Sequence, residues 1–171
     1  EKDKTKRDIK LMCMPGITDE TLSTHMLRIC EDRADALAII DLKGGFLPYT
    51  ENTNGDDSAG NRGDVDTVID NLKQRGLNSS YGCAYYPWVL VRDTATTGQT
   101  IWLPPSTVAL GVLGNSETSS ELWFAPAGFN RGGLTEGDSG LTVVGVRQKL
   151  SSKERDKLYN QNINPIASFP A

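Results

Sequence analysis

A chain of 171 residues, of which 37% are hydrophobic, can bury one sizeable core but is short for two full domains. Its net charge of -4 gives an acidic surface, which argues against nucleic acid as a partner. No apolar run approaches the roughly eighteen residues that cross a membrane, and the charged first residues lack the apolar core of a signal peptide. We therefore expect a single domain over residues 1–171, without membrane insertion.

The first third of the chain alternates apolar runs with a helical pattern. Residues 9–15 form a short apolar run that ends in a Pro-Gly turn, which predicts a buried strand. Residues 19–33 carry apolar side chains at helical spacing, and Thr18 is the candidate N-cap. Residues 36–42 form a second apolar run. Strand, helix and strand in this order predict a parallel pair covered by helices.

A long polar loop and a second helix follow. Residues 44–63 are rich in Gly, Asn and Asp, which is typical of a loop. Residues 65–75 place apolar side chains at helical spacing, Asp64 can cap their first turn, and Gly76 ends the pattern. This segment predicts a second helix over the parallel sheet.

The middle of the chain predicts a β-hairpin. Residues 83–93 are typical of a strand in which Pro87 indicates an edge position, a bulge or a late start. Residues 94–99 are a polar loop, and the chain returns through residues 100–103. A short apolar helix is then expected within residues 107–114.

The segments from Ser106 onward predict the cap of the third helix, a further strand and a final helix. Ser106 is a candidate cap, and Gly111 interrupts the apolar helix. Residues 141–150 predict a strand, and residues 151–163 predict a mostly polar helix that opens with a capping box of Ser151 and Glu154. The predicted fold class is α/β, with a mixed, largely parallel sheet flanked by helices and carrying a β-hairpin.

The sequence GDSG at 137–140 offers a candidate for catalysis. The same four residues surround the nucleophilic serine of trypsin-like proteases, and His25, Asp41 and Ser139 reproduce that chain order. Yet His25 flanks the apolar stripe of a helix, and a parallel βαβ start does not match the two antiparallel barrels of those enzymes. A turn before a strand is favoured, and a serine hydrolase using Ser139 is the alternative.

Metal sites find little support in the residue spacing. The acidic loop at 51–66 has enough oxygen atoms for a calcium ion but lacks the alternating EF-hand pattern, so a solvated loop is favoured. Cys13, Cys30 and Cys83 lie far apart among apolar residues, which favours reduced, buried thiols of a cytoplasmic protein. With one histidine and no paired cysteines, no metal and no cofactor is expected.

The segment LWFAPAGFNRGGL at 122–134 combines aromatic residues with glycines and one arginine. It lacks the GxxxxGK[ST] pattern of a phosphate-binding loop. Its glycines give the backbone angles that other residues avoid. We expect its aromatic side chains to be buried and Arg131 to brace the loop through hydrogen bonds to carbonyls or a carboxylate.

Four strings give the chain a resemblance to a known family. They are YYPW at 85–88, TTGQT leading to PPS at 104–106, WFAPAGFNRGGL at 123–134, and DKLYNQNINPIASFP at 156–170. In order and spacing they resemble the conserved C-terminal region of contractile tail sheath proteins of myovirus-type bacteriophages. The sequence TVALGVLGNSE after PPS departs from the family pattern, which leaves the helix contacts there open.

The resemblance implies a structural role without an enzymatic activity or a cofactor. It implies self-association into hexameric rings and a helical sheath around the tail tube protein, with the baseplate as a further partner. Terminal arms would add strands to neighbouring subunits, and contraction would drive the tube through the host envelope. The location implied is the virion tail, assembled in the host bacterial cytoplasm. Both ends of the chain look cut, so we expect the sheath core domain without its arms.

The resemblance also indicates which residues shape the assembly surface. We expect them in the 122–134 loop and in the 156–166 segment. They are Trp123, Pro126, Gly128, Asn130, Arg131, Gly132, Asn164 and Pro165.

Overall fold

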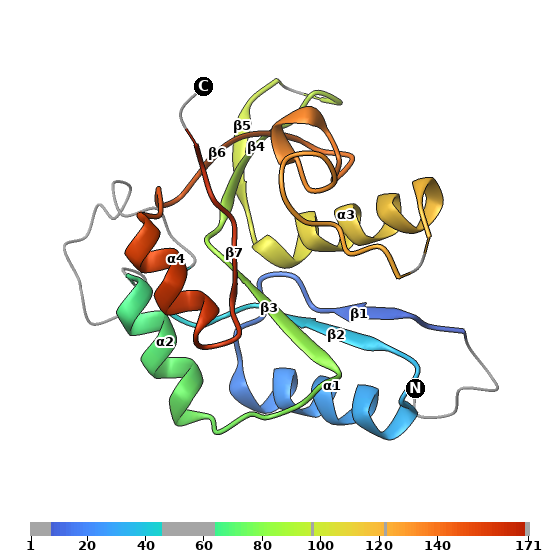
Figure 1. Ribbon diagram of the computed structural model, residues 1–171, viewed down its shortest axis with the longest axis vertical. Helices are drawn as coiled ribbons and strands as arrows, with labels where there is room; N and C mark the ends of the chain where they lie inside the picture. Colours follow the sequence, from blue (N-terminus) through green and yellow to red (C-terminus); the bar gives the residue numbers. More distant parts are fainter. Residues whose placement is uncertain (1–7, 46–63, 97, 122, 170–171) are drawn as a thin grey trace.

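The computed structural model describes residues 8–45, 64–96, 98–121 and 123–169. These residues form a four-stranded parallel sheet, a three-stranded antiparallel sheet and four α-helices (Figure 1). The predicted α/β class is therefore correct. The parallel sheet has the order β1-β2-β3-β7. Its strands are β1 Leu11–Cys13, β2 Leu37–Ile40, β3 Gly82–Tyr86 and β7 Asn164–Pro165.

Helices cover both faces of the parallel sheet (Figure 1). On one face lie α1 Glu20–Arg33, α2 Val65–Gln74 and α4 Ser152–Tyr159, whose apolar side chains share one core with the sheet. On the other face lies α3 Pro105–Ser119. The predicted βαβ start is confirmed, because β1 and β2 are parallel and α1 connects them.

Local capping explains where three of the helices begin. The Asp64 side chain accepts a hydrogen bond from the amide of Thr67 at 2.9 Å, as predicted for α2. The capping box of Ser151 and Glu154 at α4 is also confirmed. At α1 the prediction of Thr18 was wrong by one residue, because Asp19 accepts from the Leu22 amide at 2.8 Å and is the N-cap.

The expectation for the third helix was wrong in both its cap and its length. α3 begins at Pro105, and its N-cap is Pro104, whose side chain has no hydrogen-bond acceptor; the Ser106 amide of the first turn donates to Asp41 instead. Ser106 lies inside the helix and binds Asp41 instead. Gly111 does not interrupt α3, which continues to Ser119.

The strand expected at 83–93 is divided between the two sheets. β3 ends at Tyr86, the Tyr86–Pro87 peptide bond is cis, and β4 Val89–Arg92 enters the antiparallel sheet. Since proline has no amide hydrogen, it cannot continue the hydrogen-bonding ladder of β3. The predicted hairpin is confirmed: β4 pairs antiparallel with β5 Thr100–Leu103, and on its other side with β6 Thr142–Val146.

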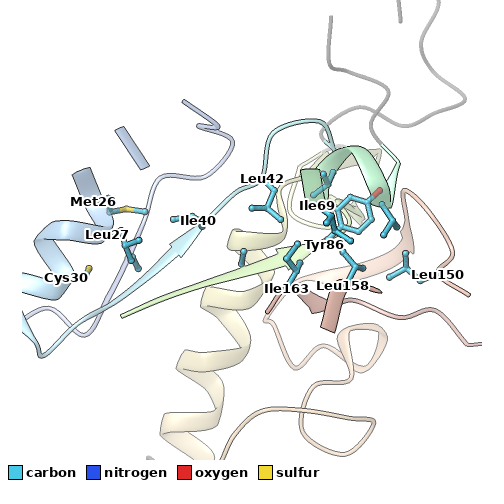
Figure 2. Close-up of a cluster of buried hydrophobic side chains, with 14 of the residues drawn as sticks. Met26, Leu27, Cys30, Ile40, Leu42, Ile69, Tyr86, Leu150, Leu158 and Ile163 are labelled. Carbon is cyan, nitrogen blue, oxygen red and sulfur yellow. The ribbon is translucent and has the colours of Figure 1, made fainter. Parts of the chain in front are cut away.

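Two clusters of buried side chains hold these layers together. The larger cluster lies between the parallel sheet and α1, α2 and α4, and Figure 2 shows Tyr86, Leu158 and Ile163 packed within it. The smaller cluster joins Val89, Val91 and Val143 of the antiparallel sheet to Val108 of α3. α3 therefore links the two sheets.

Candidate functional site

A large groove of about 980 Å³ lies beside α3. Its walls come from α3, the loop at 123–135, β6 and the C-terminal segment at 164–169. Most of its lining is apolar. Representative lining residues are Val108, Val112, Phe124, Phe129, Val144 and Ile166. It is the candidate functional site because it gathers most of the residues that the sequence indicated.

Six of the eight predicted site residues line this groove. They are Trp123, Pro126, Gly128, Gly132, Asn164 and Pro165. The other two, Asn130 and Arg131, are exposed on the same loop but do not line it. The loop and the segment after α4 lie about thirty residues apart in the sequence and meet at one surface. Their roles in assembly remain predictions.

The loop at 123–135 is shaped by short-range contacts. Gly128 has a φ of 72°, and its carbonyl accepts a hydrogen bond from the Gly132 amide at 3.0 Å. The Gly133 amide donates to Asp138 Oδ2 at 2.9 Å. Ser116 of α3 donates to the carbonyl of Phe124 at 3.1 Å, which fixes the start of the loop against the helix.

The expectation that the aromatic residues of this loop are buried was wrong for two of them. Trp123 is 78% exposed and Phe129 is 69% exposed. Phe129 meets the Phe169 ring of the C-terminal segment at a centroid distance of 5.1 Å. Trp123 meets Phe124 edge to face at a centroid distance of 5.4 Å.

Arg131 contacts an aromatic ring of its own loop. Its guanidinium carbon lies 3.8 Å from the centroid of Phe124. A cation over an aromatic face is attracted by the ring quadrupole, which makes this a stabilising contact at an exposed position. The contact found for Arg131 is therefore with a ring and differs from the carbonyls or carboxylate that we expected, and its role as a brace stays a prediction.

The wall formed by α3 is held at two points. At its N-terminus, Asp41 Oδ2 accepts from the hydroxyl of Ser106 at 2.7 Å and Asp41 Oδ1 accepts from the Ser106 amide at 3.1 Å. The Gly16 amide also donates to Asp41 Oδ2, at 2.8 Å. In the middle of α3, a Cβ atom on Gly111 would lie 2.1 Å from the carbonyl oxygen of Ser139. This helix and the GDSG turn therefore touch backbone to backbone.

The electrostatics of this wall centre on Asp41. Its side chain is 1% exposed, and burial raises its pKa, against the lowering effect of the hydrogen bonds from Ser106 and Gly16. Tyr85, which lines the groove, has its pKa raised to about 12 by burial. Its phenol is therefore neutral at physiological pH.

The three residues of the alternative hydrolase reading are not assembled into a triad. Ser139 is buried, and within the described ranges its hydroxyl donates to the Leu141 carbonyl and accepts from the Leu141 amide, both at 3.4 Å. His25 is exposed on α1, which lies on the face of the parallel sheet opposite α3 (Figure 1). Asp41 is held by Gly16 and Ser106. The GDSG segment is instead the expected turn before a strand, with positive φ at Gly137 and Gly140.

The described residues hold no group of three or more His, Cys, Asp or Glu side chains that could bind a metal ion. Residues 51–63 of the acidic loop lie outside the described residues. Cys13, Cys30 and Cys83 are free thiols. None of the helices in the described ranges is long and apolar enough to span a membrane.

Several groove residues were missed in the sequence. α3 contributes Val108, Val112 and Leu113. The segment TVALGVLG is apolar almost all round. A helix of this kind packs on more than one side, and this pattern indicated a second packing surface on α3. Val144 of β6 and Phe169 were missed because the pairing of β6 and the path of the chain after β7 depend on contacts distant in sequence.

Comparison with known proteins gives one partial similarity. The chain is 31% identical over 65 residues to the tail sheath protein of Enterobacteria phage T4. The matched stretch is 38% of this chain and spans 9% of the length of the T4 protein. No family model matches the chain. The similarity therefore relates part of this chain to a structural protein of a phage tail.

Proposed function

We propose that the chain is the core domain of a contractile tail sheath subunit. The observation that carries this proposal is the similarity to the T4 tail sheath protein, 31% over 65 residues. The gathering of six motif residues around one groove supports it, because a surface built from the family strings is what an assembly contact requires. The domain would be one part of a longer chain that also carries arms.

The groove has the composition of a protein contact surface. Contiguous exposed apolar patches mark sites of association, and aromatic residues and arginine are enriched where binding energy concentrates. Trp123 and Phe129 are exposed, and Arg131 lies beside them on the loop. We propose that this surface contacts neighbouring subunits or the tail tube protein.

Strand addition would account for assembly by terminal arms. β6 is at one edge of the antiparallel sheet and β7 is at one edge of the parallel sheet, and both line the groove. An extended segment from a neighbour could add to such an edge through main-chain hydrogen bonds. These bonds would hold subunits together while rigid domains rotate.

The mechanical cycle in this proposal is the one that the resemblance to tail sheath proteins implies. Repeated head-to-tail contacts build hexameric rings and a helical sheath around the tail tube, joined to the baseplate. Contraction needs two packings of one sequence that differ in free energy, so it requires no cofactor or enzymatic step at firing. In this proposal the sheath forms in the host bacterial cytoplasm and acts in the virion tail.

Electron microscopy of the full-length protein, alone and co-produced with its tube protein, tests the proposal. We expect rings or helical tubes. Trp123→Ala should reduce assembly at least several-fold, because it removes an exposed ring from the groove. Tyr159→Ala removes an equally exposed ring from α4, outside the groove lining, and should assemble normally. Absence of any ring or tube under all conditions would contradict the proposal.

A further inference from the structure

The chain around β7 passes from the larger cluster of buried side chains, which contains Ile163, to the smaller cluster, which Ile166 joins. The Ile166 amide donates to the carbonyl of Tyr86 at 2.7 Å, and the Ile166 side chain packs against the smaller core cluster. Residues 166–169 then form a wall of the groove. The segment is thus anchored at Ile166 and extends from there toward Phe169.

Phe169 joins three separate parts of the molecule. Its ring centroid lies 5.1 Å from that of Phe129 on the 123–135 loop, with an interplanar angle of 57°. The guanidinium carbon of Arg155, on α4, lies 4.9 Å from the Phe169 centroid. One side chain therefore connects two walls of the groove to a helix of the larger core.

This connection is exposed to solvent. Phe129 is 69% exposed and Phe169 is 51% exposed, so their contact removes little apolar surface from water. The Phe129 end of the loop is otherwise shaped by local turns such as the Gly132 to Gly128 hydrogen bond. A contact of this kind stabilises one arrangement modestly and can open without unfolding the core.

We propose that Phe169 is a latch that holds the C-terminal segment against the 123–135 loop. With the latch closed, the two walls of the groove are joined at Phe129. When the latch opens, the C-terminal segment and the 123–135 loop separate at Phe129 and the groove widens. The latch is a property of this fold and does not depend on the proposed role in a sheath.

Limited digestion with trypsin measures the opening directly. Arg131 is exposed two residues after Phe129, and proteolysis of a briefly opened segment follows the population of its open form. Mass spectrometry would follow the fragment that ends at Arg131. Phe169→Ala should raise the rate of this cleavage by about threefold to tenfold, the change expected when one aromatic pair is removed.

Controls separate the latch from general destabilisation. Cleavage after Arg92, an exposed residue of β4, should stay unchanged. Tyr159→Ala removes an exposed ring from the same helix as Arg155 and should leave cleavage after Arg131 unchanged. Phe169→Tyr keeps the ring and should also leave it unchanged.

An unchanged rate after Arg131 in Phe169→Ala would overturn the proposal. If that variant is cleaved faster at Arg92 and Arg131 alike, Arg155→Ala decides the question, because it removes the cation over the ring and, besides that, an exposed hydrogen bond to the Ser152 hydroxyl. An increase in Arg155→Ala that is confined to Arg131 supports the latch. No increase at Arg131 in that variant overturns it.

Discussion

Asp41 is the residue on which the position of α3 depends. Both of its carboxylate oxygens accept hydrogen bonds, from Gly16 and from Ser106. In Asp41→Asn an amide group would face at least one of these donors, which leaves a buried donor without an acceptor. We expect the free energy of unfolding to fall by about 1 to 3 kcal/mol. Urea denaturation at pH 7 measures this. Ser106→Ala, which removes only the hydroxyl, should lose about 1 kcal/mol.

The same residue gives the stability a pH dependence of known sign. Burial raises the pKa of Asp41 above its ordinary value of 3.8, so near that pH the folded chain keeps a proton that the unfolded chain releases. The stability that Asp41 contributes is therefore greatest at low pH and is lost as the pH rises through the raised pKa. The stability difference between the unmodified chain and Asp41→Asn should narrow from pH 4 upward. A difference that widens with pH would mean that the pKa is lowered instead.

Among the elements, α3 makes the clearest prediction. A Gly to Ala change inside a helix ordinarily stabilises by about 0.5 to 1 kcal/mol. At Gly111 the added Cβ would lie 2.1 Å from the Ser139 carbonyl oxygen, so the helix and the GDSG turn must separate. We expect Gly111→Ala to destabilise by about 1 to 3 kcal/mol. At Gly114, on the same helix, nothing lies within 4 Å of the added Cβ, and Gly114→Ala should stabilise. Thermal denaturation of both variants tests this, and two changes of the same sign would contradict it.

Elements could be predicted from the sequence where their causes are local. Asp64 and Ser151 reach amides three residues ahead, so their helices begin where the pattern indicated. Ser106 is held by a carboxylate 65 positions away, and that partner cannot be read from a cap pattern. The exposure of Trp123 was missed for a similar reason, since burial of a loop ring depends on whether another element covers it. The groove itself was indicated only through the family strings.

At the scale of the whole molecule, two cores share a connection. β3 passes directly into β4, so one continuous stretch of chain belongs to both sheets. α3 packs on the parallel sheet and contributes Val108 to the smaller cluster. Ile166, after β7, joins the same cluster while its amide bonds to Tyr86 of β3. With three such links, we expect that neither sheet loses its packing alone, and the single domain stays a prediction.

This coupling predicts one cooperative unfolding transition. Trp88 and Trp102 lie in or beside the antiparallel sheet, so tryptophan fluorescence reports mainly on that half, whereas far-ultraviolet circular dichroism reports mainly on the helices. In urea the two signals should give the same midpoint. Leu158→Ala, a fully buried change in the larger core, should cost about 2 to 5 kcal/mol and lower both midpoints together. If the circular dichroism midpoint falls while the fluorescence midpoint stays, the two sheets unfold independently. The connection through β3, α3 and Ile166 would then be too weak to make one domain.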